Sequence, residues 1–196
     1  GITSTDGVYV DGQCIDTGDC SGPKSARNIL FHPDVDAAVL ETARGGLLRE
    51  GLGFDRCHVA VVTNIGMGDH LGMAYVNTAE ELAVVKRIVV QNVTPGSGFA
   101  VLNAADPLVA SMADHCPGSV IFFARDSHHP VLAMHHAQHK RVIYVKDGCI
   151  VAVGESDEYR IPLNEIPLTK NGSINFQIEN VMAAVGACLL YTSPSP

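Results

Sequence analysis

The chain has 196 residues, 46% of them apolar and 17% charged, which is the size and balance of one packed α/β domain. Its net charge of −8 argues against general binding to nucleic acid or acidic membranes, because phosphate binding depends on clusters of Lys and Arg. No apolar run approaches the roughly 20 residues that are needed to span a bilayer.

The cysteines give no sign of a metal or redox motif. There are six, they are scattered, and none forms a C-x-x-C pair, so neither a zinc knuckle nor a redox dithiol is expected. Several stand in apolar surroundings, where cysteine packs as a small hydrophobe. We therefore predict reduced thiols in a cytoplasmic protein.

The start of the chain predicts a strand, a hairpin and a helix. Gly1–Thr3 begins as a strand, and Val8–Ile15 reads as a hairpin because Asp11-Gly12 supplies the positive φ angles of a tight turn. Ser21 followed by Pro23 indicates a capping hydroxyl and an early helical proline. That helix is predicted to reach about Leu30.

Four short apolar runs then alternate with helical patterns: Asp36–Leu40, Val59–Thr63, Phe99–Leu102 and Ser119–Phe123. Continuous apolar runs bounded by turn residues are typical of strands buried on both faces. Between them, a capping box at Thr78–Glu81 opens a helix to about Gln91, with shorter helices after Gly46 and before Ala113. This alternation predicts an α/β fold with a mostly parallel, doubly wound sheet.

The pattern changes after Arg125 to short strands, with Asp147-Gly148 as a hairpin turn: Val131–Met134, Arg141–Lys146, Ile150–Val153 and Glu158–Ile161. We predict a small antiparallel extension of the same domain, followed by a helix over Asn175–Leu190. Residues 1–190 are thus expected to form one incomplete domain. Residues 191–196 are expected to be a disordered or artefactual tail, or else a Ser/Pro linker, because their prolines cannot continue a helix.

Metal-capable side chains follow two of the predicted strands. Glu41 ends the first, and Asp69-His70 come after the second. Ligands bind beyond the carboxyl ends of strands in open parallel sheets. Magnesium prefers oxygen ligands, and Asp69 could orient the ring of His70. From the residues alone, each group could equally cap a loop through a hydrogen bond.

Two blocks, Leu40–Arg49 and Asn64–Gly72, closely resemble the Mur ligase-like domain of the cyanophycin synthetase family. The resemblance covers nearly the whole chain, from Gly1 to about Leu190. It implies an ATP-dependent carbon–nitrogen ligase, in which ATP converts a carboxylate into an acyl phosphate and an amine then displaces phosphate. In that family, the domain is held to attach arginine to the aspartate β-carboxyl of a poly-aspartate chain.

The resemblance also implies the metal and catalytic residues. It places Glu41 and His70 as magnesium ligands, with Lys86, Arg44 and Asp69 as catalytic groups. Mur ligases often carry a carbamylated lysine at the position of Lys86. The alternative there is a solvated lysine on the helix surface.

The remaining site residues are implied in the same way. Asn180, Gln177 and Asn64 would bind ATP, since an amide can both donate to and accept from a purine edge. The family often has His-Asn where this chain has Phe176-Gln177, so Gln177 would stand in as the amide. The residues expected to bind the substrate are Thr3, Thr5, Asp6 and Arg49.

The phosphate-binding loop G-x-x-x-x-G-K-[ST] does not occur in the sequence. In the family this loop ends just before the position of Gly1, and a C-terminal domain would follow Leu190. The resemblance therefore implies the central part of a longer enzyme, with at most weak ATP affinity and no turnover in isolation. The expected partners are the aspartate–arginine polymer and an amino-acid substrate, with no nucleic acid or membrane, and a homo-oligomeric full-length protein.

Other readings stay open. Another Mur ligase-like enzyme, such as a peptidoglycan or folylpolyglutamate ligase, fits the Thr42–Gly46 and Asp69–Gly72 blocks less well. A degenerate binding module is disfavoured because Glu41, His70, Lys86 and Asn180 are all present. The histidines between His128 and His139 are predicted to be a solvated edge, since their spacing does not converge on one face.

Overall fold

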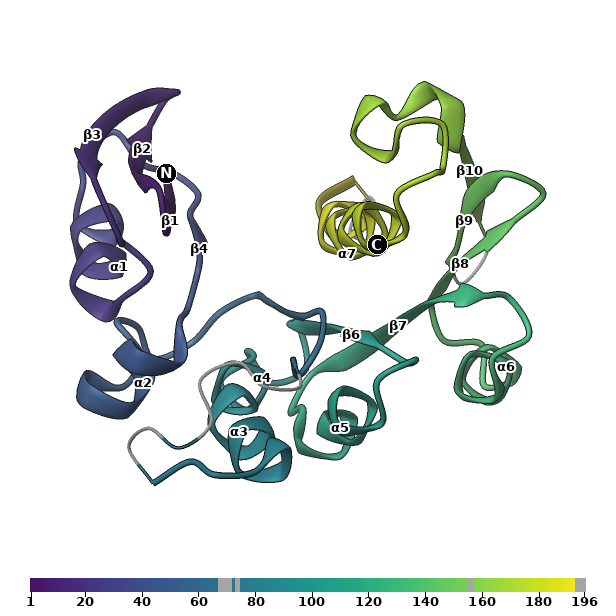
Figure 1. The fold of residues 1–196 in the computed structure, drawn as a ribbon, viewed down its shortest axis with the longest axis horizontal. Helices are drawn as coiled ribbons and strands as arrows, with labels where there is room; N and C mark the ends of the chain where they lie inside the picture. The colour runs from purple at the N-terminus through teal and green to yellow at the C-terminus, as the bar shows by residue number, and fades with distance from the viewer. Residues whose placement is uncertain (67–71, 73–74, 155–156, 193–196) are drawn as a thin grey trace. The chain divides into compact units, whose positions relative to one another are not determined.

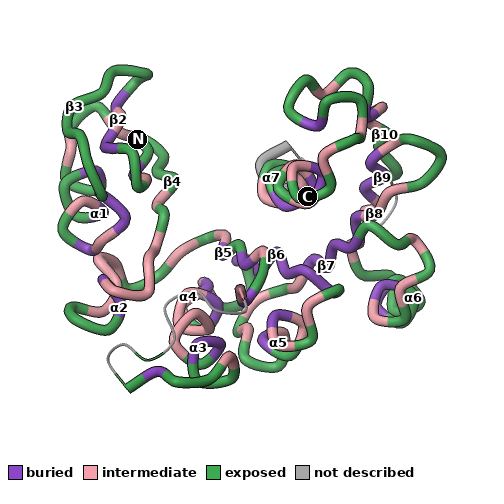
Figure 2. The backbone as a smooth tube through the Cα atoms, viewed as in Figure 1, coloured by how far each residue is buried: buried purple, intermediate pink, exposed green. Residues whose placement is uncertain are grey.

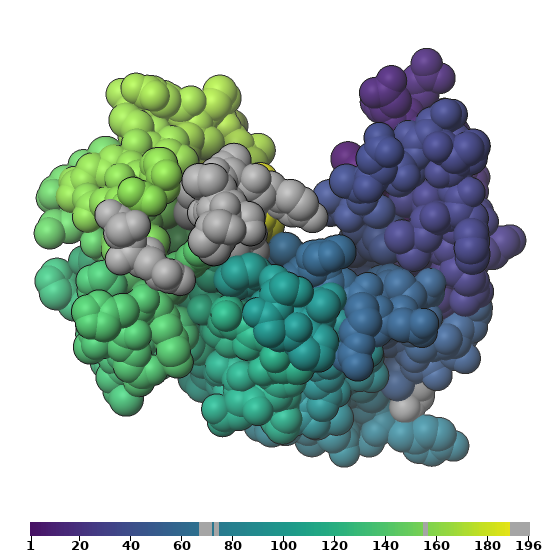
Figure 3. Space-filling model, turned by 180° about the vertical axis from the view of Figure 1, so that it is seen from behind, coloured from purple at the N-terminus to yellow at the C-terminus, as the bar shows by residue number. Residues whose placement is uncertain are grey.

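The computed structural model describes residues 1–66, 72, 75–154 and 157–192. These residues form two compact units. Unit 1 holds residues 1–56 with 72 and 75, and unit 2 holds the others. The elements of each unit are labelled in Figure 1, and Figure 3 shows one outer face of the molecule coloured by residue number.

Unit 1 is a four-stranded sheet in the order β3-β2-β1-β4. Its strands are β1 Ile2–Ser4, β2 Gly7–Val10, β3 Gln13–Thr17 and β4 Val39–Leu40, and its helices are α1 Pro23–Leu30 and α2 Arg44–Glu50. Strand β1 pairs antiparallel with β2 and parallel with β4. Val8, Val10, Cys20 and Ile29 form the small buried core between the sheet and α1.

The predicted hairpin of unit 1 is confirmed. Strands β2 and β3 pair antiparallel, and the turn between them has positive φ angles at Asp11 (48°) and Gly12 (76°). Helix α1 also begins where predicted, with Pro23 in its first turn. The predicted capping hydroxyl was wrong, because Gly22 is the N-cap and the Ser21 hydroxyl donates instead to Asp19 Oδ1.

The buried strand predicted over Asp36–Leu40 was also wrong. Only Val39 and Leu40 are in a strand, and Val39 is 69% exposed. The partner strand β1 has three residues, so little of the run can pair. The run joins the sheet of unit 1 and not the larger parallel sheet that was predicted to include it.

Unit 2 is built on a six-stranded sheet in the order β10-β9-β8-β7-β6-β5. Its strands are β5 Val59–Val62, β6 Phe99–Asn103, β7 Ser119–Asp126, β8 Val142–Lys146, β9 Cys149–Val153 and β10 Glu158–Pro162. Strands β5 to β8 are parallel, whereas β9 and β10 are antiparallel. This confirms the predicted α/β fold with a mostly parallel sheet and a small antiparallel extension.

Helices cover both faces of this sheet (Figure 1). One face carries α7 Asn175–Thr192, and the other carries α3 Ala79–Lys86, α4 Ile88–Gln91, α5 Pro107–Ala110, the 3-10 helix η1 Ser111–His115 and α6 Pro130–Ala137. Two further 3-10 helices, η2 Leu163–Glu165 and η3 Pro167–Thr169, precede α7. The result is one core on each face, and the buried strands between them are purple in Figure 2.

Three predictions for unit 2 need correction. Val131–Met134, predicted as a strand, lies in α6, which begins with Pro130 in its first turn. Strand β8 is parallel to β7, although it was assigned to the antiparallel extension. The helix predicted to run to Gln91 is divided at Arg87 into α3 and α4, beside β-branched residues that lower helix propensity.

Among the described residues, no helix is long and apolar enough to cross a membrane.

Candidate functional site

The carboxyl ends of β5 and β6 lie side by side at one edge of the parallel sheet of unit 2. Their register pairs Val62 with Leu102, so the segments that follow leave the sheet together. Thr63–Gly66 follows β5, and Ala104–Asp106 follows β6. In parallel sheets this is the edge at which ligands bind.

Lys86 and Asn64 meet at this edge. Lys86 is the last residue of α3, and its Nζ donates to the backbone carbonyl of Asn64 at 3.4 Å. The helix is fixed at its start by the predicted capping box, in which Thr78 Oγ1 accepts from Glu81 N and Glu81 Oε2 accepts from Thr78 N, both at 3.2 Å. Two predicted site residues from separate elements are therefore brought into contact.

Asp106 belongs to the same edge, and the sequence reasoning missed it. Its Oδ2 accepts a 2.7 Å hydrogen bond from the backbone N–H of Ile65. Its Oδ1 accepts from Leu108 N at 3.0 Å and from Val109 N at 3.3 Å, which caps α5. Asp106-Pro107 is a helix-start signal in the sequence, but nothing local indicates the bond to Ile65.

Gln177 and Asn180 form an amide pair on α7. They are three residues apart on one helix face, and Asn180 Nδ2 donates to Gln177 Oε1 at 3.3 Å. Asn180 is exposed, while the neighbouring Ile178 and Met182 are buried and fix the helix against the sheet. Asn180 Oδ1 can accept and Gln177 Nε2 can donate, so the pair fits the edge of a purine.

In unit 1, Glu41 follows β4 and contacts Thr5. Glu41 Oε2 accepts from the backbone N–H of Thr5 at 2.9 Å, and Glu41 N donates to the Thr3 carbonyl at 3.1 Å. The carboxylate is exposed and has a second oxygen with which to bind a cation. This donor chemistry fits a magnesium ligand.

The other residues predicted to bind substrate in unit 1 have unlike environments. Thr3 is 1% exposed, and its Oγ1 has no hydrogen-bond partner among the described residues. Asp6 is exposed in the turn after β1, and its backbone N–H donates to Ser4 Oγ at 3.2 Å. Thr5 is exposed and contacts Glu41, as described above.

Arg44 and Arg49 lie at the two ends of α2. The start of α2 is tied to the segment before α1, because Ala43 N donates to the Ser21 carbonyl at 3.0 Å. The Ser21 hydroxyl donates to Asp19 Oδ1 at 2.5 Å and thereby lowers the pKa of that carboxyl. The Ser21 backbone N–H and the positive charge of Arg49 lower this pKa further.

The expectations for Asp69 and His70 fall on residues outside those that the structure describes. Within the described ranges, no group of three or more His, Cys, Asp or Glu side chains could hold a metal ion. None of the six cysteines is in a disulfide in this structure, and their reduced state stays a prediction.

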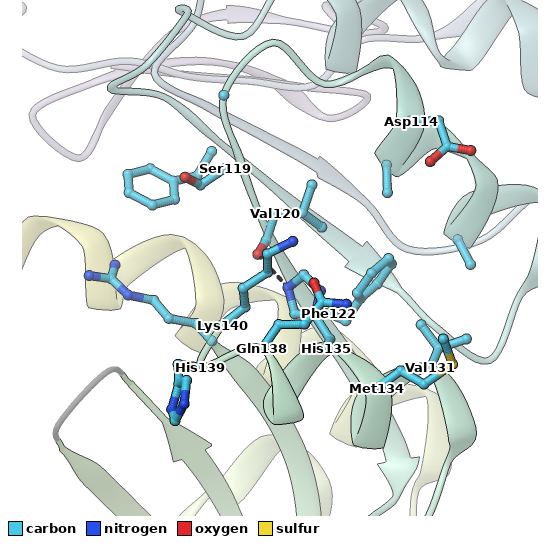
Figure 4. Close-up of a pocket in the computed structure, with 15 residues that line it drawn as sticks. Asp114, Ser119, Val120, Phe122, Val131, Met134, His135, Gln138, His139 and Lys140 are labelled. Carbon is cyan, nitrogen blue, oxygen red and sulfur yellow. Dashed lines mark hydrogen bonds between the residues drawn. The ribbon is translucent and has the colours of Figure 1, made fainter.

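A separate pocket of about 610 Å³ lies at the opposite, amino-terminal ends of β6 and β7 (Figure 4). His135 Nε2 is 2.9 Å from the Val120 carbonyl, and the ring packs edge-on against Phe122 with centroids 4.8 Å apart. Burial lowers the pKa of His135, so the neutral ring is favoured. The prediction of a solvated histidine edge is therefore wrong for His135, which is 8% exposed.

The sequence matches one family model and several known proteins. The model of the Mur ligase middle domain matches residues 1–188. Cyanophycin synthetase of Synechocystis sp. is 43% identical over 94% of this chain and 21% of its own length, and that of Crocosphaera subtropica is 41% identical over 94% and 21%. The chain thus spans about a fifth of the length of these relatives.

More distant proteins also match. UDP-N-acetylmuramoylalanine–D-glutamate ligase of Symbiobacterium thermophilum is 31% identical over 70% of this chain and 27% of its own length. The structure of a pseudomurein peptide ligase type C from Methanothermus fervidus aligns with a TM-score of 0.39 and 16% identity, covering 78% of this chain and 36% of that one. Because the Mur ligase middle domain model matches almost the entire sequence, the chain belongs to that family.

Proposed function

We propose that this chain is the nucleotide-binding and metal-binding part of an ATP-dependent carbon–nitrogen ligase of the cyanophycin synthetase type. The observation that carries the proposal is the contact between Lys86 and Asn64 at the carboxyl edge of the parallel sheet. The family match and 43% identity to a cyanophycin synthetase over 94% of the chain support it. Residues 1–190 would together form the middle domain.

The proposed reaction has two steps. The substrate carboxylate attacks the γ-phosphorus of ATP, an acyl phosphate forms, and ADP leaves. An amine then attacks the acyl carbon, loses a proton, and expels inorganic phosphate as the amide bond forms. Magnesium, when bound, would neutralise negative charge on the phosphoryl oxygens.

Each predicted site residue has a part in this proposal. Asn180 and Gln177 would hold the adenine edge, and Asn64 would lie beside the phosphates. Arg44 and a free, cationic Lys86 would stabilise negative charge at the transferred phosphoryl group. A carbamylated Lys86 would be an anion and would instead serve as a carboxylate-like ligand for magnesium. Glu41 and His70 would hold magnesium, with Asp69 orienting the histidine ring.

The proposed substrates are arginine and the aspartate β-carboxyl of a poly-aspartate chain, in a homo-oligomeric and cytoplasmic full-length enzyme. Thr5, Asp6 and Arg49 would contact the polymer, whereas Thr3 is 1% exposed and would support the neighbouring backbone from inside the unit. Arg49 offers a planar, charged fork that matches a carboxylate. A peptidoglycan-type ligase is the second candidate, and the 31% identity to UDP-N-acetylmuramoylalanine–D-glutamate ligase is the observation in its favour.

The test is a chimaera in which residues 1–188 replace the matching segment of the Synechocystis cyanophycin synthetase. We expect ATP-dependent incorporation of labelled arginine into a poly-aspartate primer, and its loss in a Lys86→Ala variant. Lys140→Ala is the matched control, because Lys140 is an exposed lysine at the opposite end of the strands. A folded chimaera without incorporation would contradict the proposal, and activity in Lys86→Ala would remove Lys86 from the site.

The 196-residue chain by itself is proposed to bind ATP weakly and not to turn over, since the sequence holds no G-x-x-x-x-G-K-[ST] loop. Isothermal titration with ATP and magnesium, together with a phosphate-release assay, checks both statements. If the purified chain released phosphate above the background of a Lys86→Ala sample, the proposal that the isolated chain does not turn over would be contradicted.

A further inference from the structure

The peptide group that joins Asn64 to Ile65, just after β5, is held from both sides. On one side, Lys86 Nζ donates to the carbonyl of Asn64 at 3.4 Å. On the other, the N–H of Ile65 donates to Asp106 Oδ2 at 2.7 Å. Ile65 is 6% exposed, so its N–H could not be satisfied by water without opening this part of the unit.

The position of Asp106 follows from the sheet. Strands β5 and β6 are parallel neighbours, so the turn after β6 reaches the segment after β5. That turn is shaped by Asn103, which is 5% exposed and whose Oδ1 accepts from Ala105 N at 2.9 Å. Asp106 then stands as the N-cap of α5 and is half-buried.

The two oxygens of Asp106 have separate tasks. Oδ1 accepts from Leu108 N and Val109 N and caps the helix, while Oδ2 accepts from Ile65 N. Helix capping alone is served equally well by Asn or Ser. The bond to Ile65 needs an acceptor at the second atom too, so only a carboxylate can do both.

We propose that Asp106 is a positioning residue of the ligase site: its carboxylate fixes the backbone of Asn64–Gly66, while Lys86 holds the same segment from α3. This inference rests on the proposed function, because it assigns to Asp106 the placement of a segment that would contact ATP. Asp106 acts through the backbone and is not proposed to touch ATP or magnesium itself. Asp69 and His70 follow this segment in the sequence.

The variant Asp106→Asn separates the two tasks. Its carbonyl oxygen can still cap α5, but its amide would face Ile65 N–H with a second donor, so that bond is lost. We expect hydrogen exchange at Ile65 in the full chain to quicken by roughly ten- to a hundredfold, while exchange at Leu108 and Val109 changes little. Exchange resolved by NMR measures both sets of amides in one sample.

Ser111→Ala is the matched control. Ser111 Oγ donates to the Leu108 carbonyl at 2.8 Å, so its loss weakens the end of α5 without touching Asp106 or Ile65. We expect unchanged exchange at Ile65 in this variant. Unchanged exchange at Ile65 in Asp106→Asn would overturn the proposal. So would an equal acceleration at Leu108 and Val109, because it would show only a lost cap.

The kinetic arm uses the chimaera described above. In Asp106→Asn we expect the KM for ATP to rise roughly tenfold while the KM for arginine is unchanged, because Asn64 is assigned to the nucleotide. If the variant only reduced the amount of folded enzyme, the rate would fall at every ATP concentration while the KM for ATP and the KM for arginine stayed the same. That result would overturn the positioning role. An inactive parent chimaera would count against the proposed function alone, because the exchange measurement still decides what Asp106 does.

Discussion

The two units of the chain differ in how firmly they hold their candidate site residues. In unit 2, the sheet is covered on both faces, and each face has its own buried cluster. In unit 1, four buried side chains form the core, and Ile2, Phe31 and Val39 are 49%, 85% and 69% exposed. Lys86 thus extends from a capped helix on a deep core, whereas Glu41 follows a two-residue strand.

This difference shows that an apolar run becomes a buried strand only if layers exist to cover it. Asp36–Leu40 and Val59–Val62 are both short apolar runs, yet only the second pairs along its whole length. Its predicted burial on both faces was wrong for one face, because Ala60 and Val62 are buried but Val61 is 42% exposed. The free energy gained from burying apolar side chains is roughly proportional to the apolar area removed from water. Unit 2 should therefore be the more stable of the two units.

Core truncation gives the largest expected effect. Phe123 is fully buried in β7, so Phe123→Ala should destabilise unit 2 by about 3–5 kcal/mol through lost contacts and a cavity. Ile29→Ala should cost unit 1 about 2–5 kcal/mol. Hydrogen exchange in increasing urea, followed by mass spectrometry, measures each unit separately. Equal loss of protection in both units from either variant would contradict their division.

The second largest expected effect is a difference in thiol reactivity between the two units. Burial raises the pKa of Cys57 in unit 2 to about 11, so roughly one thiol in a thousand is ionised at about pH 8. Cys14 in unit 1 is exposed. We expect iodoacetamide to modify Cys57 on the order of a hundredfold more slowly than Cys14, as measured by peptide mass spectrometry. Denaturing urea is the control, since it should bring the two rates together.

Between about pH 7.5 and about pH 5.5, the pH dependence of stability should belong chiefly to unit 2. Burial lowers the pKa of His135 below 6.5, with a smaller contribution from Lys140 in the same direction. The unfolded chain then binds the proton more readily, so this stability is fully present above about pH 6.5 and is lost as the pH falls toward the folded pKa.

Urea midpoints at about pH 7.5 and about pH 5.5 check this expectation. His135→Gln keeps an N–H donor but does not titrate, so the difference between the two midpoints should shrink. His136→Gln is the matched control, because His136 is exposed on the same helix. An unchanged pH difference in His135→Gln would show that another group carries it.

Helix capping gives the smallest effect and sharpens the comparison between α3 and α1. Thr78→Ala removes a capping box and should cost unit 2 about 1 kcal/mol. Gly22, the N-cap of α1, has extended backbone angles, and a Cβ at this position would meet no other atom within 4 Å. Gly22→Ser should therefore stabilise unit 1 by about 0.3 kcal/mol. Urea unfolding curves measure both, and a loss of stability in Gly22→Ser would contradict the capping argument.

Features encoded by a few neighbouring residues were predicted well. The Asp11-Gly12 and Asp147-Gly148 turns and the Thr78–Glu81 capping box are all present, because each depends on backbone angles and bonds within a few residues. The short run Val131–Met134 was wrong, since four apolar residues fit a strand or a helix and Pro130 decided for the helix.

The candidate site also depends on contacts that neighbouring residues in the sequence do not indicate. The site residues were named from their motifs, but the bonds that join Lys86 to Asn64 and Asn180 to Gln177 are seen only in the folded chain. The prediction that Glu41 binds magnesium stays a prediction, whereas Thr3, predicted to bind substrate, is only 1% exposed. Asp106 was missed because its partner Ile65 is 41 positions away, and sequence shows only its cap signal.

By itself, the sequence determined the α/β class, the parallel strands β5 to β7, the local turns, the capping box of α3, and the family. Only the tertiary structure decided that β4 pairs with β1, that β8 is parallel, and that Lys86 and Asp106 hold the peptide group between Asn64 and Ile65. The physical reason is one of range. Turns and caps are satisfied within a few residues, whereas strand partners and buried acceptors depend on which distant segments compete for the same surface.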